Sequence, residues 1–509
     1  MLSFTPPPVQ RRLFHELPAT DFGDTLLLGI EMIRNSSHLA DLIVQDQDAM
    51  ALEKKKVRQM DAEWEERRGL TKNQASLFPA NDIESESQKM LRTKQRMRPE
   101  AVFVFFLVRA YLGNIKSEQS QNFIQDSKTL DYVLALLGYD KTPGASTIVD
   151  NLNCLSPETH DALLAATVTM AKKKDLDTMQ EVYVDSTRVD ANSTWPTESK
   201  TILALFSRIM DSFLNLRKGQ LMVNIPKEVP LLLKQIESSS KAIALGMGSK
   251  GAEKKRKKEY RKILKNSKKT LQHLNKAMLR LCVKHVTEDI RPSVKLHQEG
   301  IIEQMKVDLY NVELCAKNAK KRVLQGGKVS PKEKVLGISD PDAEMISKGK
   351  TPVVFGYKPQ VARSLNGFIL ALEVPQGAAS DSSMATKMIE ASINSSNVVP
   401  KLVSFDDGYA STDNLASLEG LGIDLVSFSG SKGKKITPVD DWNSKRNLKA
   451  RNKRSMAEST MAVLKRDFGK DRFSRRGIDA VTEELKAVAV FHNLRLICRI
   501  SKKNALKAA

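Results

Sequence analysis

The sequence contains acidic residues at positions where they could perform phosphodiester chemistry. Exchange of phosphodiester bonds by two divalent metal ions requires carboxylates that converge from different elements, because oxygen ligands must hold two Mg²⁺ ions about 3.5–4 Å apart. Such residues should lie at strand ends or on a facing helix. Asp185 is the first candidate, since it lies in a segment, residues 181–190, whose β-branched residues predict a strand. A buried carboxylate without a partner would be costly there.

The second candidate position holds two adjacent acids, Asp406 and Asp407. They close a predicted strand over residues 401–405, and Gly408 after them indicates a turn at the carboxyl end of that strand. This edge is where α/β sheets usually keep their reactive groups, although Asp-Gly is also a common turn. A register slip of one residue would exchange the two acids, so spacing alone leaves the choice between them open.

The third candidate is Glu458, on a helix predicted over residues 453–467. Arg454 precedes it by four residues and Lys465 follows it by seven. At about 100° per residue, these offsets place all three side chains within about 40° of one helix face. A carboxylate flanked by cations could bind metal while the cations bind DNA phosphates. The alternative is an exposed ladder of ion pairs, which surface helices often carry.

Strands and helices alternate in the segments that must position these residues. Three strands followed by alternating helices and strands predict an α/β sheet of mixed direction. After the strand at 181–190, the predicted strands are 352–357, 367–374, 401–405 and 425–429, and the predicted helices are 383–393, 411–421, 453–467 and 480–499.

A long helical segment separates the first strand from the second. Residues 201–336 have helical patterning and are too long for a simple connection, which predicts an inserted subdomain. Within it, residues 250–284 have Glu253 and Glu259 as their only acids and include five consecutive basic residues at 254–258. A charge run is usually a solvated helix face. The cations of an almost purely basic stretch would repel one another unless negative charge compensates them. We therefore expect residues 250–284 to contact a nucleic-acid backbone.

The first 175 residues are predicted to be all-helical. Residues 1–95 form a helical region with a linker, and residues 96–175 form a small helical domain. A turn at 142–148 precedes a helix that Ser146 and Thr147 could cap, which fits either a DNA-binding helix-turn-helix or plain helical packing. The predicted helices are 21–44, 49–68, 101–112, 117–124, 130–137 and 149–155, with a Pro-rich extended start and a polar linker over 70–95.

Composition narrows the class of partner and the compartment. The 509 residues carry a net charge of +21, which favours a polyanion such as nucleic acid or an anionic membrane surface. No apolar run approaches the ~18 residues of a membrane span, and prolines 6–8 stand where a signal peptide would be apolar. The four cysteines lack paired spacing and, with the histidines near two of them, match no standard zinc motif. We therefore expect a cytoplasmic protein.

Taken together, these segments resemble the DDE transposases of bacterial insertion sequences, most closely the ISNCY-like group. The resemblance covers the chain from about residue 98 to its end, and Arg451 departs from it because related transposases often have Tyr at that place. It rests on an ordered set of motifs at 143–148, 184–192 with 195–197, 339–343 with 356–360, 406–411 with Asn414, and 454–458 with 465–469 and 475–477.

The resemblance implies a fold and a set of site residues. The fold is α/β, an RNase H-like mixed sheet over residues 176–500 with the large helical insertion after its first strand, preceded by the all-helical N-terminal region. Asp185, Asp406 and Glu458 would hold two Mg²⁺ or Mn²⁺ ions, with Asp406 selected over Asp407 by its spacing from the Gly-Tyr turn. Arg454 and Lys465 would act with them as catalytic residues that steer phosphates.

The implied activity is that of an insertion-sequence transposase. Such an enzyme cleaves DNA at the terminal inverted repeats of its element and transfers the strand to target DNA. The resemblance also implies a homo-oligomer that acts at the bacterial nucleoid, without a membrane partner. Two alternatives stay open: a non-catalytic DNA-binding protein derived from a transposase, and an RNase H-like nuclease that cuts without joining.

Overall fold

The structure is a computed structural model, and its chain divides into two compact units. We call residues 1–50, 82–192 and 346–509 the sheet unit, and residues 51–81 and 193–345 the helical unit. The described residues are 20–68, 96–113, 115–193, 197–218, 221–246, 251–330, 333, 337–347, 353–377, 379–469 and 471–508. The extended start and the linker predicted near the N-terminus, and residues 195 and 196 of one motif, lie outside the described residues.

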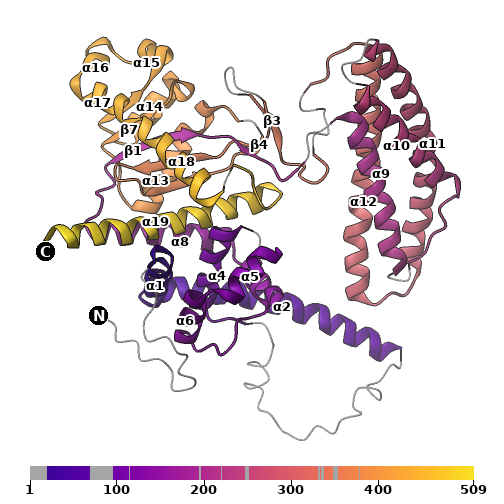
Figure 1. The fold of residues 1–509 in the computed structure, drawn as a ribbon, viewed down its shortest axis with the longest axis horizontal. Helices are drawn as coiled ribbons and strands as arrows, with labels where there is room; N and C mark the ends of the chain where they lie inside the picture. The colour runs from indigo at the N-terminus through magenta and orange to yellow at the C-terminus, as the bar shows by residue number, and fades with distance from the viewer. Residues whose placement is uncertain are drawn as a thin grey trace, which may run out of the picture. The chain divides into compact units, whose positions relative to one another are not determined.

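A mixed five-stranded sheet forms the centre of the sheet unit (Figure 1). The central strand β1 runs antiparallel to β5, which runs antiparallel to β6, whereas β7 and β8 run parallel to β1. This confirms the predicted mixed α/β class, and the order is that expected of an RNase H-like sheet. The strands, in sheet order, are β6 (Ile369–Glu373), β5 (Gln360–Ser364), β1 (Glu181–Ser186), β7 (Leu402–Phe405) and β8 (Leu425–Phe428).

The alternation of side chains along β1 divides the core between the two faces of the sheet. On one face, Val182 and Val184 pack in the same apolar core as residues of α13 (Ala385–Ser396). Tyr183 instead packs with Ala450 of α17 (Lys445–Lys453) and Ala457 of α18 (Ser455–Phe468). Asp185, two residues after Tyr183, therefore belongs to the face that α17 and α18 cover.

Two predictions about strands differ from the structure. The segment predicted as one strand at 181–190 is two, because β1 ends at Ser186 and β2 (Val189–Asp190) pairs with β4 (Val354–Tyr357) in a separate small sheet. Strand β5 was not predicted, because Gln360, Arg363 and Ser364 make it polar, yet each of these residues is buried. A further short strand is β3 (Glu344–Ile346).

The sequence analysis predicted some helices of the sheet unit and missed others. Those predicted from the pattern are α13, α14 (Thr412–Gly420), α18 and α19 (Ile478–Ala508). The sequence analysis missed α8 (Pro157–Lys173), although Ser156 accepts a hydrogen bond from the Thr159 backbone and a proline follows it, a recognisable helix start. It also missed the short helices α15 (Gly430–Ile436) and α16 (Val439–Asn443), and α17.

The N-terminal helices confirm the predicted all-helical region, with two corrections. The break between the first two helices falls at residues 35–36, not between 44 and 49. The predicted caps Ser146 and Thr147 are wrong, since both lie inside α7 and Gly144 is its N-cap. A DNA-binding role for this region stays a prediction. The helices are α1 (Asp21–Arg34), α2 (Ser37–Arg67), α4 (Pro99–Leu112), α5 (Glu118–Asp126), α6 (Lys128–Leu136) and α7 (Ala145–Asn153).

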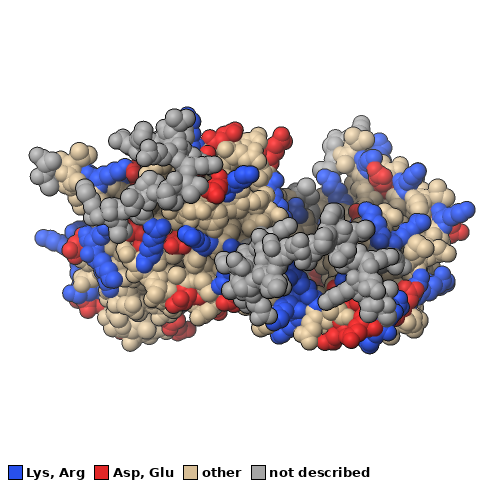
Figure 2. All heavy atoms as spheres, turned by 90° about the horizontal axis from the view of Figure 1, so that it is seen from below, with Lys and Arg blue, Asp and Glu red and all other residues tan. Residues whose placement is uncertain are grey.

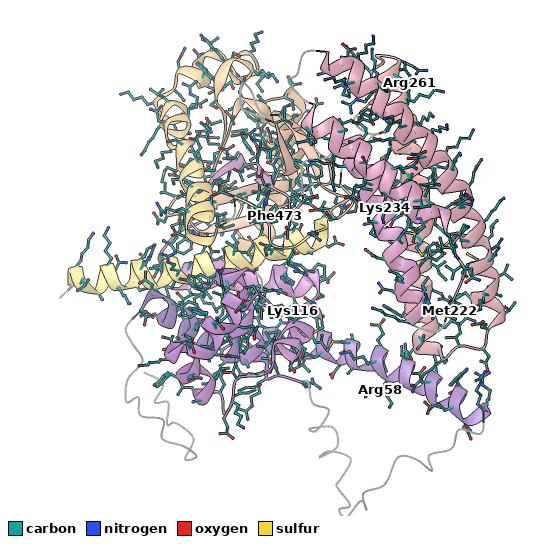
Figure 3. The ribbon with its side chains drawn as sticks, turned by 45° about the vertical axis from the view of Figure 1, so that its right-hand side comes forward. Arg58, Lys116, Met222, Lys234, Arg261 and Phe473 are labelled. Carbon is teal, nitrogen blue, oxygen red and sulfur yellow. The ribbon has the colours of Figure 1, made fainter. Side chains whose placement is uncertain are left out.

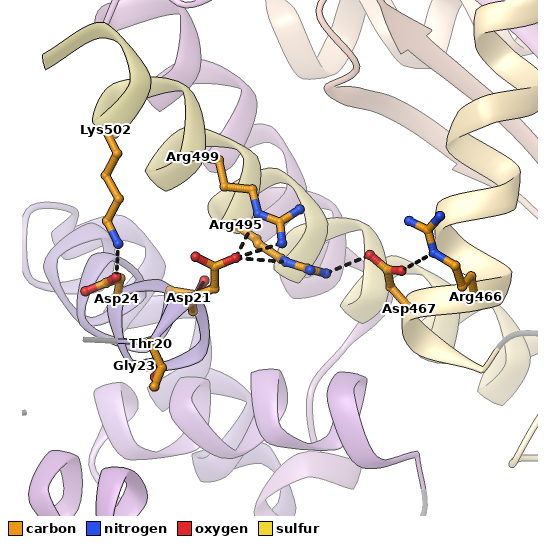
Figure 4. A network of polar contacts seen from close by, with 10 residues as sticks. Thr20, Asp21, Gly23, Asp24, Arg466, Asp467, Arg495, Arg499 and Lys502 are labelled. Atoms are coloured by element: carbon orange, nitrogen blue, oxygen red, sulfur yellow. Dashed lines mark hydrogen bonds and ion pairs between the residues drawn. The ribbon is translucent and has the colours of Figure 1, made fainter. Parts of the chain in front are cut away.

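Ion pairs connect the N-terminal helices to the helices that follow the sheet (Figure 4). Arg499 of α19 lies 2.7 Å from Asp21 of α1, and its hydrogen bond lowers the pKa of that carboxyl. Arg495 of α19 lies 2.9 Å from Asp467 of α18. Helix α19 thereby joins α1 to α18, the helix that carries Glu458.

The helical unit consists mainly of four long helices that lie side by side (Figure 1). Apolar residues from all four form one core, with Phe206, Ile236, Leu274 and Met305 almost fully buried. The helices are α9 (Glu198–Lys218), α10 (Glu228–Leu245), α11 (Ala252–Thr287) and α12 (Pro292–Ala319), and a π-helical turn, η1 (Lys320–Leu324), follows α12.

The surface carries the excess of basic residues that the composition indicates. Lys and Arg side chains are spread widely over the face drawn in Figure 2, with Asp and Glu between them. In the described part of the chain, no helix is both long and apolar enough to span a membrane.

Candidate active site

Asp185 lies near the end of the central strand β1, where it pairs in register with Val361 of β5. Its side chain is 7% exposed. The Ser186 backbone N–H donates a hydrogen bond of 2.7 Å to its Oδ1. Burial of a carboxylate is costly unless polar or charged groups compensate it, so the surroundings of Asp185 must supply positive charge.

Asp406 follows β7, the strand next to β1, and is the residue before a short 3₁₀ helix (Asp407–Tyr409). Because β7 is parallel to β1, the carboxyl ends of both strands meet at the same edge of the sheet. Ser429, just after β8, donates a hydrogen bond of 3.2 Å to Asp406 Oδ1. Asp406 is therefore held at the edge where β1 ends with Asp185 and Ser186.

Asp407 has a different environment from its neighbour. Its Oδ1 accepts hydrogen bonds from the backbone N–H groups of Lys432 and Gly433, at 2.8 and 3.1 Å, in the first turn of α15. Gly430, which has φ of +83°, provides the space, because a Cβ at that position would lie 2.6 Å from Asp407 Cγ. Asp407 thus accepts hydrogen bonds from backbone N–H groups that have no partner within α15, a structural role that Asp406 does not share.

Arg454 links the three candidate positions. It lies between α17 and α18, and its guanidinium is 3.4 Å from Asp185 Oδ2 and 2.8 Å from Glu458 Oε1. Burial acts to lower the pKa of Arg454, but the hydrogen bond with Glu458 and the charges of Asp406, Asp185 and Glu458 outweigh it and raise that pKa. One guanidinium therefore lies within the electrostatic field of all three carboxylates.

Glu458 and Lys465 lie in less enclosed positions on α18. The Glu458 side chain is 58% exposed, so it forms the open side of the site. Lys465 donates a hydrogen bond of 2.9 Å to the backbone carbonyl of Arg188, three residues beyond Asp185. The structure thus brings Asp185, Arg454 and Glu458 into contact, holds Asp406 at the same sheet edge, and places Lys465 beside the segment that leaves β1.

Residues 332–494 match the family model described as the transposase DDE domain. The chain contains a DDE-type transposase domain. No curated protein and no solved structure matched the chain in the corresponding comparisons. The matched range contains Asp406 and Glu458 but not Asp185, which β1 brings to the same edge of the transposase domain from an earlier part of the chain.

The donor types at this sheet edge suit a hard divalent cation, because Asp185, Asp406 and Glu458 all offer carboxylate oxygens. As the side chains stand, no group of three or more His, Cys, Asp or Glu among the described residues could hold a metal ion. In the structure, positive charge at the three carboxylates comes from Arg454. The residue types therefore fit Mg²⁺ or Mn²⁺.

A buried polar network that the sequence analysis missed supports the two strand-borne acids. Asp381, before α13, accepts hydrogen bonds from Lys358 at 2.8 Å and from Gln360 at 3.1 Å, and the Tyr409 hydroxyl donates to the Gln360 side-chain oxygen. Gln360 is the register partner of Ser186, next to Asp185. The network therefore connects β1, through β5, to the turn that follows Asp406.

Electrostatics agree with an ionised Asp381 in this network. Burial acts to raise its pKa, but the hydrogen bonds from Lys358 and Gln360 and the Lys358 charge outweigh it, so the pKa is lowered. Burial raises the pKa of Tyr409, which stays a neutral donor. Three of these residues lie within or beside motifs that the sequence analysis used, but spacing does not show that they meet.

Proposed function

We propose that the chain is the transposase of a bacterial insertion sequence, which cleaves DNA at the ends of its element and joins them to target DNA. The observation that carries this proposal is the convergence of Asp185, Asp406 and Glu458 on Arg454, from β1, the end of β7 and the first turn of α18. The transposase DDE domain match over residues 332–494 supports it.

In this proposal the three carboxylates hold two divalent metal ions. When bound, Mg²⁺ or Mn²⁺ would activate the attacking hydroxyl and stabilise the leaving oxygen of the phosphodiester. Asp185 and Asp406 supply oxygens from the rigid sheet edge, and Glu458 supplies its oxygens from the exposed side of α18. Asp407 is not part of the set, because its carboxylate is engaged with α15.

The cations of the site have a separate role. Three carboxylates in one place repel a phosphodiester, so a DNA strand needs fixed positive charge nearby. Arg454 supplies it within the site, and its planar guanidinium can bind a phosphate oxygen pair as well as a carboxylate. Lys465 of α18, held beside Arg188, adds a second cation. The reaction requires no covalent protein–DNA intermediate, so no Ser or Tyr nucleophile is assigned.

The experiment that tests the proposal is DNA cleavage by the full chain with Mg²⁺ or Mn²⁺ and DNA that carries the terminal repeats of its element. We expect Asp185→Asn, Asp406→Asn and Glu458→Gln each to lower the cleavage rate by more than ~100-fold, because even loss of an outer-shell partner costs about 10–100-fold. Asp407→Asn is the matched control. It keeps an oxygen that accepts from Lys432 and Gly433, so it should cut like the wild type.

Each other outcome selects a different function. Cleavage without strand-transfer products indicates a nuclease of the same fold. DNA binding without cleavage by the wild type indicates a non-catalytic DNA-binding protein. If Asp407→Asn is inactive and Asp406→Asn is active, the assignment of the second ligand is wrong.

A further inference from the structure

Helix α11 of the helical unit has two opposite faces of very different character. The packed face includes Tyr260, Ile263, Leu274 and Leu281, which are at most 3% exposed. At about 100° per residue, one set of cations lies within about 60° of the direction opposite to that face. Lys262, which pairs with Glu259, and Arg280 lie at the edge of this set. We call the remaining members the α11 stripe, and they are Lys254, Lys258, Arg261, Lys265, Lys268, Lys269 and Lys276.

The cations of the α11 stripe are exposed and are not neutralised within the helix. The two acids of this part of α11 pair with other residues: Glu253 with Lys257 and Glu259 with Lys262, each at 2.8 Å. Among the described residues, no member of the stripe takes part in an ion pair. Figure 3 labels one member, Arg261, on α11. The stripe therefore offers its charge to a partner outside the helical unit.

The length of the stripe matches a feature of duplex DNA. From Lys254 to Lys276 the helix rises by about 33 Å at ~1.5 Å per residue, which is close to the ~34 Å of one turn of B-DNA. Beyond Lys276 the same face turns apolar, with Leu279, Val283 and Val286 between 64% and 75% exposed. Apart from Arg280 at its edge, the cationic part of this face thus ends at Lys276.

We propose that the α11 stripe binds the phosphate backbone of duplex DNA over about one helical turn. An extended row of cations suits a polymer with a regular negative charge along one line. An anionic membrane fits less well, because a helix that lies in a bilayer surface inserts its apolar face, and the large apolar face of α11 is buried in the core. The stripe also lies outside the transposase DDE domain match, so it adds a DNA contact to that domain.

This proposal deepens the proposed function and rests on it for the choice of DNA as the polyanion. Its test measures binding alone, in the full chain with Asp185→Asn and without divalent metal, so that it does not depend on cleavage. The stripe variant carries Lys254→Gln, Lys258→Gln, Lys265→Gln and Lys269→Gln. The matched control removes four charges elsewhere in the same unit, with Lys234→Gln, Lys241→Gln, Lys306→Gln and Lys317→Gln on α10 and α12. Lys234 is labelled in Figure 3.

The readout is the slope of log affinity against log salt concentration for a labelled duplex of about 30 base pairs, which covers roughly three turns. We expect the slope to become less negative by about 3–4 in the stripe variant, since each phosphate contact contributes about 0.9. The control should change it by less than about 1. A Lys→Arg variant at the four stripe positions should keep the wild-type slope, because it keeps the four positive charges.

Equal slopes for the stripe variant and the control overturn the proposal and leave the stripe as a solvated helix face. Loss of binding to anionic vesicles, with DNA binding unchanged, overturns it in favour of a membrane surface. If the slope becomes less negative in the stripe variant while the wild-type chain never cuts DNA, that result supports DNA binding by the stripe and rejects only the proposed function.

Discussion

The sheet edge that carries the candidate acids and the outer face of α11 differ in how their charged side chains are paired and buried. Around the sheet edge, charged groups are paired and most of them are buried: Arg454 pairs with the buried Asp185 and with the exposed Glu458, and Lys358 pairs with Asp381 with both side chains less than 20% exposed. Along α11, most cations are exposed and face solvent. A buried charge requires a partner, whereas an exposed one costs little without it. The ion-paired side chains at the sheet edge therefore hold one another in a fixed geometry. The exposed, unpaired cations of the α11 stripe stay available to a partner.

Among the tests of this comparison, we expect the largest effect on stability at the buried ion pair of Lys358 and Asp381. Lys358→Met leaves the Asp381 carboxylate buried without its cation, so the free energy of unfolding should fall by about 3–5 kcal/mol. Urea unfolding of the full chain measures it. The double variant Lys358→Met with Asp381→Leu should recover part of the loss, because it removes the uncompensated charge. A loss below about 1 kcal/mol would mean that Gln360 and Ser186 alone satisfy Asp381.

A half-buried histidine of α19 provides a test of the sheet unit by pH. Burial lowers the pKa of His492 to about 4, and its ring donates to the Gly367 carbonyl. The folded state thus resists protonation, so stability is lost as pH falls from about 6.5 to about 4, by roughly 3 kcal/mol in all. Unfolding of the full chain at several pH values should show a smaller acid loss in His492→Gln than in the wild type. Parallel curves would contradict the prediction.

Single cations from the two regions should differ in their effect on activity. We expect Arg454→Gln to slow DNA cleavage on the order of 100-fold, because it removes the only contact shared by Asp185 and Glu458 among the described ion pairs. Lys265→Gln, one cation of the α11 stripe, should change the rate at saturating DNA less than about twofold, as rim charges affect association more than chemistry. Equal effects of the two substitutions would remove the distinction between the regions.

The smallest effect is expected at an exposed ion pair of α11. Glu253→Gln removes the partner of Lys257, and the midpoint of unfolding should stay unchanged, because exposed pairs of this kind contribute little. The salt dependence of DNA binding should stay the same or become slightly steeper, since Lys257 is released. A lowered midpoint would show that α11 depends on its few acids.

The sequence alone was sufficient for elements whose signals are local. Strands β7 and β8 and helices α13 and α14 have their own hydrophobic period and turn residues, and these elements lie where the pattern predicted them. Strand β5 was missed because its polar residues are buried through partners far along the chain, such as the Arg363 guanidinium with the Met456 carbonyl. A local window does not contain that information.

For the site, the sequence by itself determined which acids were candidates and that Arg454 stands four residues before Glu458; the single helix predicted over 453–467 begins instead at Ser455, with Arg454 as the residue before it. Only the tertiary structure decided how they meet: the parallel pairing of β7 with β1 sets Asp406 at the edge where Asp185 lies, and the start of α15 engages Asp407. The reason is physical. A motif specifies residue types and spacing, whereas the role of a carboxylate depends on donors and charges that reach it from elements distant in the chain.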